Sequence, residues 1–198
     1  MKKFAAGGRT AVISTINGDS NVPFYKELGN QGLKAKDVLG AAFSVGEEEL
    51  RGIDTKPLVG HLAAWNYAMS VKNPENEKFI KQYRDWALKN PIANASSVVT
   101  NDPMEATDVG LMMWKQTAEK ARSVEVDKVR PAMYGQTFKA SCGFTLTMDK
   151  TNHPLHKPVM IGEVQGNGQC SVVCKTQEPV RANPWPPFIA GNEGKQKV

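Results

Sequence analysis

Two short polar loops contain the residues of this sequence that are best suited to bind a small molecule. The first loop holds Asn17, Gly18 and Asp19, and the second holds Phe43 and Ser44. A carboxylate accepts hydrogen bonds, an amide and a hydroxyl both donate and accept them, and a glycine lets a ligand come close to the backbone. This set of groups suits a small, neutral, polar solute that is held by several directed hydrogen bonds.

Structural interpretations of the same region stay open beside this one. Asp19 or Ser20 could serve only to cap the helix that should follow, and Ser44 could be only a turn residue. The acidic run at residues 47–49 suits the positive end of a helix dipole, which gives it a purely structural explanation.

The sequence shows no other arrangement typical of a catalytic or cofactor site. Residues 40–46 lack the glycine pattern of dinucleotide-binding proteins and the Lys-Ser/Thr pair of a P-loop. His153 and His156 have a spacing that can ligate a metal on a helix, but Pro154 and Pro158 favour a loop and no third ligand is evident. No serine lies in a G-x-S-x-G elbow. No catalytic constellation is visible, so the residues by themselves leave an enzyme open, although we expect none; we also expect no cofactor and no metal.

The three cysteines form no metal or redox pattern. Cys170 and Cys174 are four positions apart in an expected strand, a separation of about 13 Å, which exceeds the limit of roughly 7 Å for a disulfide. Either could pair only with Cys142 or stay free. We expect buried, small hydrophobic side chains at these positions.

The composition is that of a globular protein with one domain or two small ones. The chain has 198 residues, of which 40% are hydrophobic and 23% charged, and a formal net charge of +5. The basic residues are scattered, so we expect no nucleic-acid partner. No apolar run approaches the roughly 20 residues of a membrane span. The apolar stretch at residues 4–6 is too short for a signal peptide, so we expect no export signal in this chain.

The first 65 residues read as alternating strands and helices. Strands are expected at 10–16, 38–43 and 58–64, with helices from residue 22 and residue 47 between them. The first strand is almost continuously apolar, which predicts that both of its faces are covered. This order implies a parallel sheet. Ligands bind such sheets beyond the carboxyl ends of the strands, where both polar loops lie.

The next segment reads as two longer helices. Asn73 and Pro74 are the expected cap and first residue of one helix, which ends near residue 90. Asp102 and Glu105 have the spacing of a capping box. The helix behind them, to about residue 120, is so rich in apolar residues that we expect it to lie buried between layers.

The end of the chain reads mainly as β-structure. A third helix is expected at about 126–134, and a hairpin of strands 157–164 and 169–174 turns at the glycines of residues 166–168. Several prolines then predict an irregular tail.

Several motifs, in one order along nearly the whole chain, resemble the urea and short-chain-amide substrate-binding proteins of ABC transporters. They are VISTINGDSN with FYKEL (residues 12–28), AFSVGEEEL (42–50), GHLAAWNY (60–67), TNDPMEA (100–106), and KPVMIGEV with GQ (157–169).

The resemblance implies an α/β fold, the type I periplasmic-binding clamshell, in which two lobes close on a solute. The chain resembles only its C-terminal half, so we expect parts of both parallel-sheet lobes and a C-terminal hairpin, with apolar edges exposed. Residues 1–61 would end one lobe, 62–155 would form the returning part of the other, and 156–198 would be the hairpin and tail that return to the first. Trp65–Tyr67 would lie near a hinge.

The same resemblance implies a function. The chain would be a substrate-binding component, in a truncated form, of an ABC transporter for urea or a related short-chain amide. Its partners would be that neutral solute and a permease in the membrane, and its location periplasmic or otherwise extracytoplasmic. The ligand contacts carried over are Asn17, Gly18, Asp19, Phe43 and Ser44. The alternatives are an amide-sensing regulatory protein of the same fold and a small α/β nucleotide-binding domain or enzyme.

Overall fold

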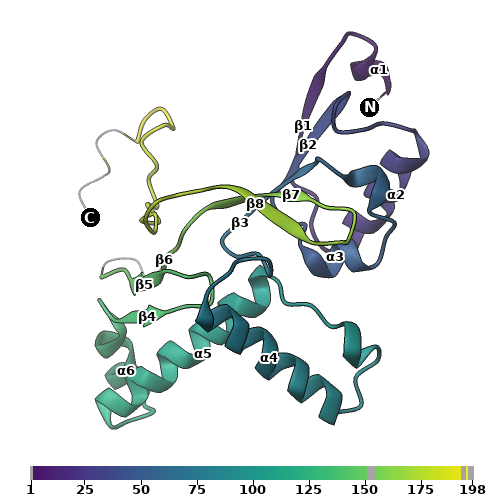
Figure 1. Cartoon of the computed structure of the whole chain (residues 1–198). Coiled ribbons are helices and arrows are strands. Elements are labelled where there is room, and N and C mark those ends of the chain that lie inside the picture. Colours follow the sequence, from purple (N-terminus) through teal and green to yellow (C-terminus); the bar gives the residue numbers. More distant parts are fainter. Residues whose placement is uncertain (1, 151–154, 193–194, 196–198) are drawn as a thin grey trace.

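The computed structural model describes residues 2–150, 155–192 and 195, and it confirms the predicted α/β class. One sheet has five strands in the order β1-β2-β3-β7-β8, and a second has three strands in the order β4-β5-β6. Figure 1 shows β1 and β2 with helices α2 and α3 at one end of the molecule, and helices α4, α5 and α6 at the other.

The first part of the chain forms the predicted parallel strands, since β1 pairs with β2 and β2 pairs with β3 in parallel. A short helix, α1, precedes them. The elements in order are α1 (Lys2–Ala5), β1 (Thr10–Ser14), the 3-10 turn η1 (Gly18–Ser20), α2 (Asn21–Asn30), β2 (Val38–Ala42), α3 (Glu47–Arg51), the 3-10 turn η2 (Lys56–Leu58) and β3 (Leu62–Trp65).

Strand β1 is not covered on both faces, so that prediction is wrong. It is an edge strand, and among the described residues it pairs only with β2. Its Ile13 is 66% exposed. An apolar run indicates how much side-chain surface a strand can bury. It does not specify which other segments of the chain cover the strand.

The second part contains the three predicted helices and the small antiparallel sheet. The elements are α4 (Pro74–Lys89), the 3-10 turn η3 (Ala95–Ser97), α5 (Asp102–Ala121), α6 (Val126–Met133), β4 (Thr137–Lys139), β5 (Thr145–Met148) and β6 (Leu155–His156). Asn73 caps α4 as predicted, because its side chain accepts a hydrogen bond from the Asn76 amide at 2.9 Å.

Two predictions for α5 are wrong. Its cap is Asn101, whose side chain accepts from the Met104 amide at 3.2 Å, and the Asp102 carboxylate instead accepts from the Asn66 amide. The helix is also not buried between layers, since Leu111 is 62% exposed and Trp114 42% exposed. The described part of the chain covers only one stripe of α5, which includes Val109 and Met113.

The chain ends with the predicted hairpin and irregular tail. Strand β7 (Met160–Val164) pairs antiparallel with both β3 and β8 (Cys170–Lys175). Described residues 176–192 form no helix or strand and contribute one isolated bridge, between Val180 and Lys157. Cys142 and Cys170 are free and buried as expected, whereas Cys174 is free but exposed.

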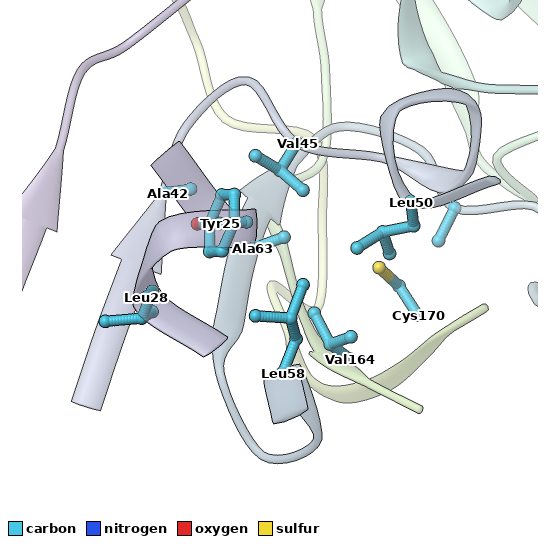
Figure 2. Packing of buried hydrophobic residues seen from close by; sticks show 10 residues of the cluster. Tyr25, Leu28, Ala42, Val45, Leu50, Leu58, Ala63, Val164 and Cys170 are labelled. Carbon is cyan, nitrogen blue, oxygen red and sulfur yellow. The ribbon is translucent and has the colours of Figure 1, made fainter. Parts of the chain in front are cut away.

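Two hydrophobic clusters stabilise the two ends of the molecule. Figure 2 shows side chains from α2, β2, α3, β7 and β8 meeting in the first cluster, which includes Tyr25, Leu50 and Val164. The second includes Val109 and Leu146. Strands β3 and β7 extend from one cluster toward the other. Two segments, residues 66–73 after β3 and 157–159 before β7, therefore cross between the two ends.

Candidate functional site

The two predicted loops lie together beyond the carboxyl ends of β1 and β2. We call this end of the five-stranded sheet the sheet edge. Because β1 and β2 are parallel and Ser14 is paired with Ala42, the loops that follow them emerge side by side. Asn17, Gly18 and Asp19 are exposed, and Gly18 has a φ of +61°, a left-handed conformation that favours glycine. Phe43 is 53% exposed at the same edge.

The second loop is hydrogen-bonded to the first. The Ser44 hydroxyl donates to the backbone oxygen of Ile16, and the Asn21 side-chain amide donates to the backbone oxygen of Ser44 at 3.0 Å. Asn21 is fully buried. Because both loops are fixed to each other, their polar groups keep a constant relative position.

The structure also bears on the structural alternatives for these residues. Ser20 occupies the N-cap position of α2, yet its side chain makes no capping hydrogen bond. Asp19 lies in the preceding 3-10 turn, and its exposed carboxylate has no hydrogen-bond partner among the described residues. Ser44 has a structural role in joining the loops, and its oxygen can still accept a further hydrogen bond.

The acceptor groups of this edge define what it can recognise. The Ser44 proton is committed to Ile16, so Ser44 offers a ligand only an acceptor. The Asp19 carboxylate is also only an acceptor when ionised. A ligand that presents N–H groups could donate to either acceptor.

The three glutamates at the start of α3 do not share one role at the positive end of the helix dipole. Glu48 forms an ion pair with Arg51, and the Glu49 carboxylate accepts from the Gly46 amide at 2.9 Å. Glu47 is buried and accepts from the Met69 amide at 2.8 Å. Burial raises the pKa of Glu47 to about 7, although the Met69 hydrogen bond favours its charged form.

The two crossing segments contact the start of α5 in a partly buried polar group that we call the crossing cluster: Asn66, Asp102, Glu105, Lys157 and Pro158. The Asn66 backbone amide donates to Asp102 at 2.7 Å, and its side chain donates to the Pro158 oxygen at 2.6 Å. Lys157 pairs at 2.8 Å with Glu105, which is fully buried. Burial raises the pKa of Glu105 and of Asp102, and Lys157 opposes this shift in both.

Sequence reasoning missed Asn21, Glu47 and Lys157. Asn21 is part of a quoted motif, but nothing in the motif indicates that its side chain reaches the second loop. Nothing in the sequence separates Glu47 from its two acidic neighbours, because its burial depends on the distant segment around Met69. Lys157 and Glu105 are 52 residues apart, so no local pattern connects them.

The expected absence of a metal stays a prediction. His153 lies outside the described residues, and His156 is hydrogen-bonded to Asp149 at 2.8 Å. In the part of the chain that the structure covers, no group of three or more His, Cys, Asp or Glu side chains could hold a metal ion. None of the described helices is long and apolar enough to cross a membrane.

Comparisons with solved structures agree with this fold. A solute-binding protein of an ABC transporter from Rhodopseudomonas palustris HaA2, in complex with p-hydroxybenzoic acid, has a TM-score of 0.73 and 21% identity, with 91% of this chain and 48% of that one covered. An amino acid ABC transporter substrate-binding protein from Pseudomonas fluorescens Pf-5 has a TM-score of 0.68 and 15% identity, with 84% and 44% covered. This chain therefore spans about half the length of these proteins.

A curated protein is also similar over part of the chain. "Limonene hydroxylase" of Geobacillus stearothermophilus is 28% identical over 130 residues, which is 66% of this chain and 22% of that protein. A match to so small a share of the other protein assigns no activity to this chain.

The family described as "Periplasmic binding protein domain" matches residues 1–190. The α/β architecture and the parallel strands agree with the type I form of this fold, of which the chain spans about half. The chain belongs to the periplasmic binding protein domain family.

Proposed function

We propose that this chain is part of the solute-binding component of an ABC transporter for urea or a related short-chain amide. Family membership and the likeness in fold to solute-binding proteins support the transport role. The proposed ligand contacts are the five loop residues Asn17, Gly18, Asp19, Phe43 and Ser44.

The observation that carries the solute class is the pair of acceptors at the sheet edge. Urea presents four N–H groups and a primary amide presents two, so each can donate to Asp19 and to Ser44. A carboxylate ligand such as the p-hydroxybenzoic acid of the Rhodopseudomonas protein would instead place its negative charge near Asp19. The two acceptors at Asp19 and Ser44 therefore favour a ligand that donates N–H groups, such as an amide, over a carboxylate.

The lobe arrangement and the partners are part of the same proposal. The predicted division into 1–61, 62–155 and 156–198 stays a prediction, and the membership of β3 in the five-stranded sheet favours a first boundary just after Trp65. We propose that the exposed Ile13 and Leu111 pack against parts of the clamshell that this chain does not span. The complete receptor would deliver its solute to a membrane permease from an extracytoplasmic compartment.

Ligand-observed NMR with the chain tests the solute class. Urea has four non-hydrogen atoms, so even an ideal site gives it a Kd no lower than about 40 µM. We expect saturation transfer from the protein to acetamide, and displacement of acetamide by urea. Benzoate at the same concentration should not displace it. Binding of benzoate together with no response to acetamide, formamide or urea would contradict the proposal.

A further inference from the structure

Asn21 connects both loops of the candidate site from a buried position. Its backbone N–H donates to the Gly18 oxygen in the first loop, and its side-chain amide donates to the Ser44 oxygen in the second at 3.0 Å. The residue is fully buried at the start of α2, so it cannot touch a ligand on the exposed edge.

The other atom of the same side chain shows that this arrangement has a cost. Asn21 Oδ1 is buried and has no hydrogen-bond partner in the described part of the chain. A buried carbonyl without a partner destabilises a fold, and native proteins contain few of them. Such violations are expected where function constrains the sequence. The same side chain therefore leaves its oxygen without a partner while its nitrogen donates to the Ser44 backbone oxygen.

We propose that Asn21 is a positioning residue that holds the Gly18 loop and the Ser44 loop in register. It acts on the solute only through them, and its effect on binding rests on the proposed function. Without the Asn21 side chain, Ser44 keeps its own bond to Ile16, but its backbone oxygen loses the donor from α2. The loops then move relative to each other, and the two acceptors no longer match one ligand geometry.

The chain offers a matched control for this side chain. Asn76 is also fully buried, and its side-chain amide donates to the backbone oxygens of Met69 and Val71, far from the candidate site in sequence. Asn76→Ala therefore removes a buried asparagine that connects backbone segments elsewhere. It should lower stability and leave acetamide affinity unchanged.

The experiment measures amide hydrogen exchange, acetamide affinity and guanidinium unfolding for the chain, Asn21→Ala and Asn76→Ala. For Asn21→Ala we expect exchange at residues 16–19 and 43–46 to rise about tenfold relative to β2 and α5, and acetamide affinity to fall about tenfold. Asn21→Ser, which keeps a small polar residue at the helix start, should show the same loop effect if the alanine variant folds poorly.

Two results would overturn the positioning role. One is unchanged loop exchange in Asn21→Ala, and the other is a uniform rise in exchange across the chain, as expected for a purely structural residue. If the unsubstituted chain does not bind acetamide, the proposed function fails, and the exchange data still test Asn21. If it binds acetamide and Asn21→Ala binds equally well, the function stands and the inference about Asn21 is wrong.

Discussion

The polar residues of the two loops and those of the crossing cluster lie in opposite environments. Asp19 is exposed and has no hydrogen-bond partner among the described residues, whereas Glu105 is fully buried and paired with Lys157. An exposed polar group can bind a ligand and costs little to change. A buried charge is expensive to separate from its partner. We therefore expect substitutions in the loops to change ligand binding and substitutions in the crossing cluster to change stability.

The largest effect should come from breaking the buried ion pair. Lys157→Met leaves the fully buried Glu105 without its cation, and we expect it to lower the free energy of unfolding by about 3–5 kcal/mol. Guanidinium unfolding measures this, because urea is itself a proposed ligand. Lys115→Met, which breaks the exposed pair with Glu119, should change stability by less than about 1 kcal/mol. Equal effects of the two substitutions would remove the contrast between buried and exposed charges.

A second prediction concerns the pH dependence of stability. The pKa of Glu47 is about 7 in the folded chain against an ordinary value of 4.5, so the folded chain binds this proton more tightly than the unfolded chain does. Protonated Glu47 contributes about 3 kcal/mol to the free energy of unfolding. This contribution is fully present below pH 4.5 and is lost as the pH rises through 7.

The isosteric Glu47→Gln variant isolates this contribution, since it keeps an oxygen for the Met69 amide. Unfolding curves at pH 5 and pH 8 should differ less for the variant than for the unsubstituted chain. His61 acts in the opposite direction, because burial lowers its pKa and stability then falls as the pH drops below about 6.5. Identical pH profiles for the two proteins would show that Glu47 does not titrate in this range.

A substitution in the loops should give the opposite result to one in the crossing cluster: the affinity for acetamide falls and the free energy of unfolding is unchanged. Asp19→Ala removes a charged acceptor, and we expect acetamide affinity to fall about tenfold. Its unfolding free energy should stay within about 0.5 kcal/mol. Asp127→Ala, an exposed aspartate on α6, is the matched control and should change neither quantity. If both substitutions weaken binding equally, Asp19 has no specific role.

The smallest expected effect concerns the shape of the first loop. Gly18 has a φ of +61°, and an added methyl group would meet no atom within 4 Å, so Gly18→Ala costs only backbone strain of about 1 kcal/mol. Gly110→Ala in α5 also meets no atom within 4 Å, but it should stabilise the chain by about 0.5–1 kcal/mol, because alanine favours helices. Effects of the same sign would show that Gly18 is not held in this conformation.

Local patterns predicted much of the fold and the position of the candidate loops. The parallel strands β1 to β3, the Asn73 cap and the hairpin of β7 and β8 all follow from periodicity, caps and turns within a few residues. These signals involve residues that are close together in the sequence, so they can be recognised without the structure.

The misses concern segments that meet only in the folded chain. Burial of β1 and α5 depends on which other segments cover them, and Ile13 and Leu111 are exposed despite their apolar surroundings in sequence. The pairing of Glu105 with Lys157 and the reach of Asn21 to Ser44 join positions that are 52 and 23 residues apart. Adjacent Asn101 and Asp102 are both suitable caps, and only the contact with Asn66 distinguishes them.

The most direct test of this account is a two-dimensional NMR titration of the ¹⁵N-labelled chain with acetamide. We predict shifts of the backbone amides at Gly18, Asp19 and Ser44 that saturate together, while the amides of Glu105 and Asn66 in the crossing cluster stay unchanged. Shifts confined to other parts of the chain, or none at the loops up to the solubility limit of the ligand, would contradict the assignment of the solute site to this edge of the sheet.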